Sequence, residues 1–152
     1  ITFLTGVVKR YITDFGTEEL LNKPNVTVFP HVGGSTSEAE LNCAIMAAQT
    51  IRRFMETGEI VNSVNFPRVQ QVLSAPYRIT LINKNVPNIV ARISTAVSDF
   101  NINIDNIINR SKGEYAYTLL DLDETDKSKI DELVAKFEAS DNIVRVRLIK
   151  GK

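Results

Sequence analysis

Hydrophobic residues recur at helical spacing over one long stretch in the first half of the chain. This spacing places them on one face of an α-helix, which we predict over residues 36–57. Ser35 and Glu38 fit the capping-box pattern at its start, and Gly58 favours a left-handed end. More apolar residues lie off this face, so we expect the helix, with a buried Cys43, to be covered on several sides. The predicted face comprises Leu41, Ala44, Ile45, Ala48, Ile51 and Met55.

Two β-like runs precede this helix. Residues 7–14 are rich in β-branched and aromatic side chains and end at Asp14, and residues 26–29 form a second run that is closed by Pro30. Two strands and one long apolar helix leave too much surface uncovered to form a domain. We therefore predict that residues 1–70 are the end of an incomplete α/β region.

After residue 76 the hydrophobic pattern becomes a compact alternation of strands and helices. The order β-α-β-β-α-β predicts a ferredoxin-like domain over residues 77–150, with a four-stranded antiparallel sheet and both helices on one face. In the last strand, Arg145 and Arg147 lie on the side opposite the apolar residues. Residues 71–76 are predicted to be a linker, and the fold class is α+β overall. The predicted elements span residues 77–84, 89–100, 102–109, 115–122, 128–139 and 143–149.

Composition narrows the possible functions. The chain has 152 residues, 43% of them hydrophobic and 24% charged, with zero formal net charge. A balanced charge does not favour a nucleic-acid or membrane-surface partner, and no apolar run approaches the roughly 18 residues that span a bilayer. A single cysteine excludes an internal disulfide and fits a reducing cytoplasm, and no Cys or His pair is present to bind a metal.

The segment of residues 30–40, P-H-V-G-G-S-T-S-E-A-E, holds the only histidine, His31, where a predicted strand gives way to the helix. Strand ends of this kind line ligand-binding crevices in α/β sheets. The segment alone leaves two interpretations open. His31 is either a functional residue or an incidental histidine in a helix-capping loop.

Two parts of the chain resemble known families. The segment P-H-V-G-G-S-T-S-E-A-E-L-N, followed by I-V-N-S-V-N-F-P up to Pro67, resembles the C-terminal end of the catalytic region of the D-2-hydroxyacid dehydrogenases. Residues 77–149 resemble the ACT domain, a regulatory module of ferredoxin-like fold. The resemblance implies that residues 1–70 belong to a Rossmann-like, NAD-dependent enzyme of the cytoplasm that oxidises 3-phosphoglycerate in L-serine biosynthesis.

The resemblance also implies roles for individual residues. His31 matches the catalytic histidine, which exchanges a proton with the substrate hydroxyl, a task that suits an imidazole. Glu18 matches the carboxylate that orients this histidine, and Glu19 is the alternative. Either glutamate could instead be a solvated charge.

Three further residues match the cofactor side of the family's active site. Asp14 matches an aspartate that binds the nicotinamide carboxamide, and Gly33 and Gly34 match positions where the backbone approaches the nicotinamide ring. Asp14 could instead simply end its strand, and the two glycines could form a plain turn before the helix. The chain starts at Ile1 without methionine and contains no G-x-G-x-x-G motif. We therefore expect a fragment that is inactive on its own.

In the second part, Asn85 and Asn103 match ACT positions that hold an amino-acid effector across a domain interface. Asn88 stands where many effector-binding members have glycine, and Asn83 stands where some serine-binding relatives have histidine. The resemblance implies L-serine as the effector, and these two departures weaken that implication. A homodimer through residues 77–150 is the expected assembly. Two alternatives remain open: a domain that serves only oligomerisation, and a free-standing amino-acid-binding regulator without catalysis.

Overall fold

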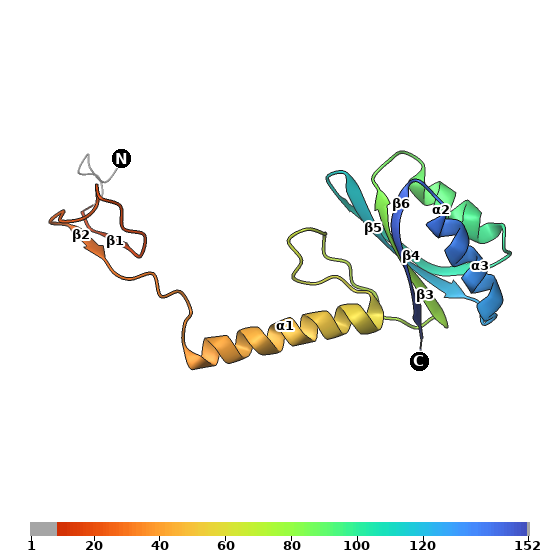
Figure 1. The fold of residues 1–152 in the computed structure, drawn as a ribbon, viewed down its shortest axis with the longest axis horizontal. Helices are drawn as coiled ribbons and strands as arrows, with labels where there is room; N and C mark the ends of the chain where they lie inside the picture. The colour runs from red at the N-terminus through yellow and green to blue at the C-terminus, as the bar shows by residue number, and fades with distance from the viewer. Residues whose placement is uncertain (1–8, 152) are drawn as a thin grey trace. The chain divides into compact units, whose positions relative to one another are not determined.

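The computed structural model describes residues 9–151. The chain forms two compact units, residues 1–45 and residues 46–152. The division falls inside one helix, α1, which spans Ser37–Thr57 and therefore contributes residues to both units (Figure 1). Each unit has its own sheet. The boundary predicted at residues 71–76 concerns domains of a longer protein and stays a prediction.

The first unit contains two short strands. β1 spans Tyr11–Thr13 and β2 spans Val26–Val28, and they pair in parallel with Tyr11 opposite Val26. Both lie inside the predicted runs, of which residues 7 and 8 lie outside the described residues. Parallel pairing is typical of α/β regions, but two strands do not make a Rossmann-like sheet, so that part of the fold prediction stays a prediction. No described residue of this unit is buried.

Helix α1 ends as predicted and begins differently. Thr36 Oγ1, and not Ser35, accepts a hydrogen bond from the Ala39 N–H at 3.1 Å, so the predicted Ser35–Glu38 capping box is wrong. Thr36 is one residue nearer the first helical turn, which is where a cap must lie to reach an N–H three residues on. At the other end, Gly58 has φ +71°, the left-handed conformation expected there.

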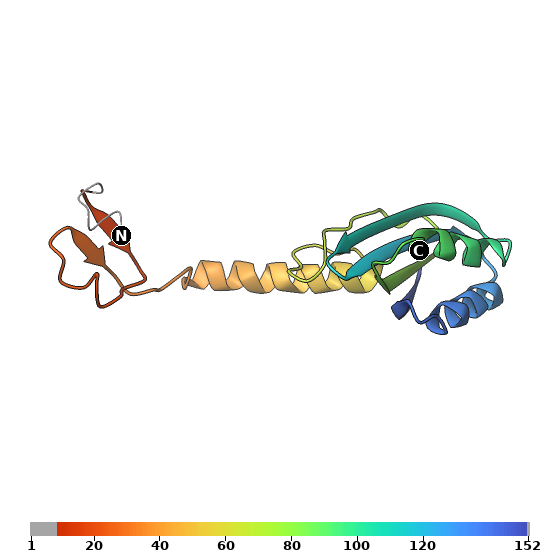
Figure 2. The ribbon, with the colours of Figure 1, turned by 90° about the horizontal axis from the view of Figure 1, so that it is seen from above.

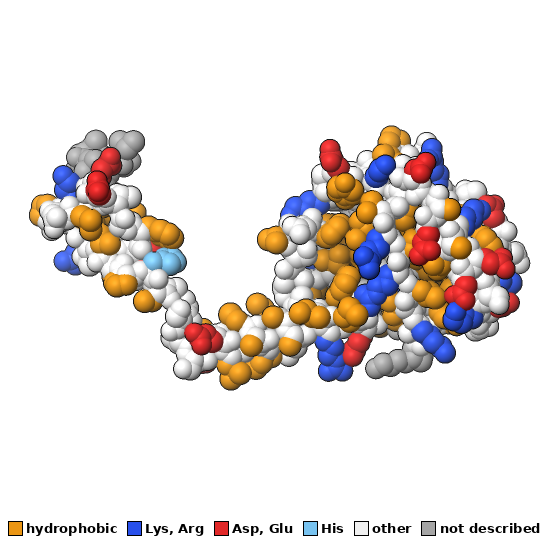
Figure 3. Space-filling view, viewed as in Figure 1, with side chains coloured by type: hydrophobic (Ala, Val, Ile, Leu, Met, Phe, Trp, Pro, Cys, Tyr) orange, Lys and Arg blue, Asp and Glu red, His pale blue; other side chains and the backbone are white. Residues whose placement is uncertain are grey.

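The expectation that α1 is covered on several sides is also wrong for this chain. None of its residues is buried, and Cys43 is exposed. Hydrophobic side chains along the helix are visible in Figure 3. The apolar face that the spacing predicts is present, but no described segment packs along its length.

The second unit has the predicted order β-α-β-β-α-β. Its four strands form an antiparallel sheet in the order β4-β5-β3-β6, so β4 and β6 are the edge strands. The order and sheet confirm the α+β class and the ferredoxin-like arrangement. The elements are β3 at Tyr77–Lys84, α2 at Ile89–Ser98, β4 at Asn103–Lys112, β5 at Tyr115–Asp123, α3 at Lys127–Glu138 and β6 at Ile143–Lys150.

One face of this sheet, the inner face, packs against α2 and α3, and Figures 1 and 2 show both helices on the same side. Alternate residues of the central strands point to the inner face, because successive side chains of a strand alternate between faces. The buried residues of this core include Ile79, Leu81, Leu120 and Leu122 from the strands and Ile93, Val97, Ile130, Leu133 and Phe137 from the helices.

The opposite or outer face is covered by residues 58–76. Ile60 and Val69 exchange backbone hydrogen bonds of 2.8 and 3.0 Å, and their side chains pack with Tyr117 and Leu119 of β5. Both faces of the sheet therefore have a core. The segment between α1 and β3 is a structural layer of the second unit.

Candidate functional site

The histidine of the first unit is paired with an aspartate. His31 Nδ1 lies 2.7 Å from Asp14 Oδ2, and their side chains are 53% and 33% exposed. Asp14 follows β1 directly and His31 lies three residues after β2, so the parallel pairing of these strands brings the two side chains to the same end of the pair. The Phe15 ring packs on the imidazole with ring centroids 4.4 Å apart. The structure thus builds a histidine–carboxylate pair from residues 17 positions apart in the sequence.

The carboxylate in contact with His31 differs from the one that the resemblance implies. Glu18 and Glu19 lie in an exposed turn, and within residues 9–151 neither forms an ion pair with the imidazole. Asp14, which the resemblance assigns to the nicotinamide carboxamide, takes that place. The orienting role of Glu18 stays a prediction, and so does the cofactor role of Asp14.

The two glycines after His31 have different environments. Gly33 has φ +53°, and a Cβ placed there would have no heavy atom within 4 Å. A Cβ at Gly34 would have only the Ala39 Cβ within 4 Å, at 3.6 Å. The left-handed turn explains why glycine suits position 33. The open space beside both residues fits the approach of a flat ring, which stays a prediction.

The two effector-site candidates of the second unit lie at opposite ends of the sheet. The Asn85 N–H donates to Glu114 O at 2.8 Å, and Asn85 Nδ2 donates to Gly113 O at 3.1 Å, which ties Asn85 to the β4–β5 turn. Asn103 opens β4 opposite Asp123, at the far end of this ten-residue strand. At about 3.4 Å per residue, roughly 30 Å separates the two ends. One chain therefore does not bring Asn85 and Asn103 together.

The neighbouring asparagines have structural roles that explain their departures from the resembled pattern. Asn88 has φ 65° directly before α2, a left-handed conformation that asparagine tolerates better than most residues. Asn83 is buried, and its Oδ1 accepts from Thr118 Oγ1 at 2.9 Å. Asn109 Nδ2 in turn donates to Thr118 Oγ1 at 2.7 Å. This network across three strands contains two residues, Asn109 and Thr118, that no sequence motif singles out.

A buried ion pair lies on the outer face and was missed by sequence reasoning. Arg78 Nε and Nη2 lie 2.5 and 2.7 Å from the two carboxylate oxygens of Asp121, and both side chains are at most 1% exposed. The pair is directly cross-strand, because Arg78 of β3 is in register with Asp121 of β5. The remaining donors of Arg78 bind backbone carbonyls, and its Nη1 lies 2.8 Å from Thr57 O and 2.9 Å from Gln71 O. Arg78 thus joins the sheet to the end of α1 and to the segment before β3.

Two more side chains of the sheet bind the end of α1. Arg147 of β6 donates to the carbonyls of Phe54, at 2.8 Å, and Met55, and its guanidinium lies 5.0 Å from the centre of the Phe54 ring. The Tyr117 hydroxyl donates to Gly58 O at 2.7 Å, and burial raises the pKa of this phenol. The last carbonyls of a helix lack partners within it and carry partial negative charge, which arginine donors satisfy. The α1 end is therefore fixed to the second unit.

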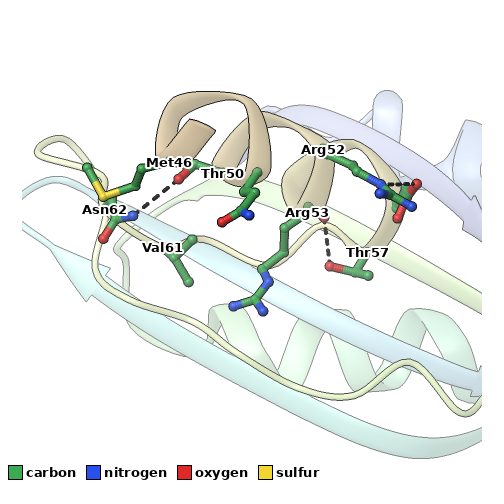
Figure 4. A pocket seen from close by; sticks show the side chains of 9 residues that line it. Met46, Thr50, Arg52, Arg53, Thr57, Val61 and Asn62 are labelled. Carbon is green, nitrogen blue, oxygen red and sulfur yellow. Dashed lines mark hydrogen bonds and ion pairs between the residues drawn. The ribbon is translucent and has the colours of Figure 1, made fainter. Parts of the chain in front are cut away.

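A cavity of about 500 Å³ lies between α1 and the segment that follows it. Figure 4 shows Asn62 pointing to Thr50, to which Asn62 Nδ2 donates at 3.1 Å, while Arg53 extends from the helix past Val61. The two arginines that line the cavity have acidic neighbours. Arg52 Nε lies 2.9 Å from Glu56 Oε1, and Arg53 Nε lies 3.6 Å from Glu59 Oε2. None of the catalytic, cofactor-binding or effector-binding residues predicted from the sequence lines this cavity, and we assign it no function.

Two kinds of feature are absent from residues 9–151. These residues contain no group of three or more His, Cys, Asp or Glu side chains that could hold a metal ion. Among the helices of the described part, none is long and apolar enough to cross a membrane.

Comparison with known proteins places the chain beside one group of enzymes. No protein-family model matches it. It is 33% identical over 139 residues to D-3-phosphoglycerate dehydrogenase 2 of Saccharomyces cerevisiae, a match that covers 88% of this chain and 29% of the yeast protein. It is 26% identical over 133 residues to D-3-phosphoglycerate dehydrogenase of Escherichia coli, covering 88% of this chain and 32% of that one. The chain thus spans about a third of the length of these relatives.

Among solved structures, the ACT domain from GTP pyrophosphokinase of Chlorobium tepidum aligns with 48% of this chain and 95% of its own. The sequence identity is 18% and the TM-score 0.44. The regulatory subunit of aspartate kinase from Thermus thermophilus aligns with 51% of this chain, at 21% identity and a TM-score of 0.38.

Proposed function

From the homology of this chain to the C-terminal region of D-3-phosphoglycerate dehydrogenases, we propose that it is part of an NAD-dependent enzyme that oxidises 3-phosphoglycerate to 3-phosphohydroxypyruvate. One observation carries the proposal. A single alignment runs through 88% of the chain and so includes residues of both units in one continuous order. A free-standing regulatory domain would match only over residues 46–152.

The His31–Asp14 pair supports a proton-transfer role in this reaction. With Nδ1 held 2.7 Å from the Asp14 carboxylate, the imidazole donates from Nδ1, and Nε2 is left to accept a proton. His31 then removes the proton of the substrate hydroxyl, and Asp14 stabilises the imidazolium that forms. A bound NAD would supply the hydride acceptor for the hydrogen on the carbon that carries this hydroxyl.

The residues present fit only one end of that cofactor. The open left-handed turn at Gly33 leaves room for a flat ring beside His31. The G-x-G-x-x-G motif, whose loop would hold the pyrophosphate, does not occur in the sequence. We therefore propose that the rest of the site comes from other sequence of the complete enzyme, and that the 152-residue chain alone produces no NADH from 3-phosphoglycerate.

A chimeric enzyme tests this function. Residues 1–152 replace the matching region of the yeast relative, and phosphoglycerate-dependent NADH production is measured. We expect activity, and we expect His31→Gln to lower kcat by at least about 100-fold, the size of effect that general acid–base catalysis contributes. Lys23→Gln, an exposed change in the same unit, is the matched control. A His31→Gln chimera as active as its parent would contradict the proposed role.

We propose a regulatory function for the second unit. Asn85 and Asn103 lie at opposite ends of one sheet, but β4 is an edge strand, and antiparallel pairing of two β4 strands would bring Asn103 of the partner subunit toward Asn85. An amino acid such as L-serine would then bind between two chains, with asparagine amides able to donate and accept.

Calorimetry and light scattering test this second proposal. L-serine titrated into the chain should release heat at one site per chain, and Asn85→Ala should abolish that heat. A monomeric mass at micromolar concentration would contradict the dimer. Heat from serine together with an inactive chimera would favour the alternative, a free-standing amino-acid-binding regulator.

A further inference from the structure

A second cavity, which we call the outer-face cavity, lies on the outer face of the sheet beside the end of α1. Its volume is about 230 Å³, equal to the share of about eight molecules of liquid water. Seven residues from α1, β3, β5 and β6 line it, and none of the seven is acidic. The strand residues that line it belong to the outer face, so the cavity lies on the other side of the sheet from α2 and α3.

The strand register explains how this cavity forms. Ile82 of β3 is opposite both Tyr117 of β5 and Arg145 of β6, so these three side chains form one row across the sheet. Thr80 and Arg147 belong to the next row on the same face. Figure 3 shows basic side chains beside hydrophobic ones on the second unit. The floor of the cavity thus changes from apolar at the centre of the sheet to cationic at its β6 edge.

The wall of the cavity is fixed by hydrogen bonds. Phe54 and Met55 belong to the last turn of α1, and Arg147 binds the backbone carbonyls of both. The same guanidinium lies over the Phe54 ring. Arg147 is therefore already satisfied, and it holds the apolar wall in place beside Ile82 and Tyr117.

Arg145 differs from Arg147 although it lines the same cavity. It is exposed, and within residues 9–151 no hydrogen bond or ion pair involves its side chain. A guanidinium carries five donors in a planar fork that matches a carboxylate. The cavity therefore offers an apolar interior and, at its rim, a cation without a counter-ion.

We propose that the outer-face cavity binds a small monocarboxylate with a compact apolar body. The carboxylate pairs with Arg145, and the apolar part packs on Ile82, Tyr117 and Met55. The volume sets the size class, because pockets for drug-sized ligands measure about 300–1,000 Å³. The mostly apolar floor disfavours a strongly hydrated dianion such as phosphate, which would lose its hydration there without enough donors to replace it. This site is independent of the function proposed for Asn85.

The test uses 3-phenylpropanoate as the probe and the full 152-residue chain, labelled for NMR. Titration should shift the methyl signals of Met55 and Ile82 most. The uncharged isostere 3-phenylpropanamide should bind at least about tenfold more weakly, since it lacks the charge-assisted pairing. Arg145→Gln should weaken 3-phenylpropanoate by a similar factor. Arg92→Gln, the same change at an exposed arginine of α2, should leave the affinity unchanged.

Equal affinity for acid and amide, or unchanged affinity in Arg145→Gln, would overturn the proposal. So would the absence of binding at about 10 mM probe, because a dissociation constant above that concentration means a binding free energy weaker than about 3 kcal/mol. Asn85→Ala separates this site from the amino-acid site proposed above. It should abolish the serine heat and leave the 3-phenylpropanoate shifts in place. Shifts centred on Asn85 would instead assign the probe to that other site.

Discussion

The two units of this chain differ in how their side chains are held. In residues 9–45, strands of three residues pair once, and every described side chain is at least partly exposed. In residues 46–151, a four-stranded sheet has a core on each face, with Leu81, Leu120 and Leu133 fully buried. Yet the first unit contains His31, the candidate catalytic residue, and the second contains most of the packing.

This contrast separates a unit whose side chains are held by a core from one whose side chains are not. Burial of apolar area is the main favourable term in folding, and the first unit buries little of it. The His31–Asp14 pair is accordingly half-exposed, and water weakens a contact between side chains of that exposure. The comparison predicts that changes in the second unit affect stability and that changes in the first affect only function.

The largest effect is expected at the buried ion pair. Asp121→Ala leaves the Arg78 guanidinium buried without its carboxylate, which should lower the free energy of unfolding by about 3–5 kcal/mol. Urea denaturation at neutral pH measures it. Asp131→Ala is the matched control, because Asp131 pairs with Lys127 on the surface and should contribute no more than about 1 kcal/mol. Similar losses in the two variants would show that the outer face does not hold this unit together.

A pair of leucine variants compares the two units directly. Leu120→Ala removes a fully buried side chain of the inner core and should cost about 2–5 kcal/mol of unfolding free energy. Leu41→Ala changes a side chain that is 61% exposed on α1 in the first unit, and should change stability by less than about 0.5 kcal/mol. Urea denaturation measures both changes. Equal shifts of the urea midpoint in the two variants would contradict the difference between the units, since they would mean that Leu41 is covered in solution.

The smallest effect concerns the carboxylate of Glu124, a partly buried residue just before α3. Glu124 accepts hydrogen bonds from the backbone N–H groups of Asp126 and Thr125 and from Lys129 Nζ, and these bonds lower its pKa to about 2. Because the folded pKa lies below the ordinary value of 4.5, the carboxylate stabilises the folded state above about pH 4.5. That stabilisation is lost as the pH falls through about 2.

Thermal unfolding as a function of pH tests this prediction. Glu124→Gln should lower the melting temperature at pH 6, and the difference from the unchanged chain should shrink between pH 4.5 and pH 2. Glu132→Gln, an exposed change on α3 without such bonds, should not alter the pH dependence. A difference that stays constant over that range would contradict the assignment to the Glu124 carboxylate.

The sequence predicted local structure better than contacts between distant residues. Strand β3 has the predicted bounds of residues 77–84, and Gly58 ends α1 in the left-handed conformation, because periodicity and backbone preference are local properties. The outward side of Arg145 and Arg147 also follows from alternation within one strand. The capping box failed for a local reason too, since Ser35 and Thr36 are both good caps and the pattern alone did not decide between them.

The missed features all depend on contacts between segments that are distant in the sequence. Arg78 and Asp121 are 43 positions apart in the sequence and meet only because β3 and β5 pair in one register. The packing of Ile60 and Val69 on Tyr117 and Leu119 also joins distant segments, and the loose alternation of residues 59–68 does not predict this covering layer. The contact of Asp14 with His31 depends likewise on the pairing of β1 with β2.

The bonds that fix the end of α1 also predict where this helix starts to form. Forming the first turn is the costly step of helix formation, and later residues add at little cost. Arg78 and Arg147 bind carbonyls of the last turn and Tyr117 binds that of Gly58 directly after it, whereas residues 37–45 are not buried and have no such bonds. We therefore expect the helix to nucleate near Thr57 and to extend backward toward Ser37. Amide hydrogen exchange should be slowest in its final turns and become faster, residue by residue, toward the loop that carries His31.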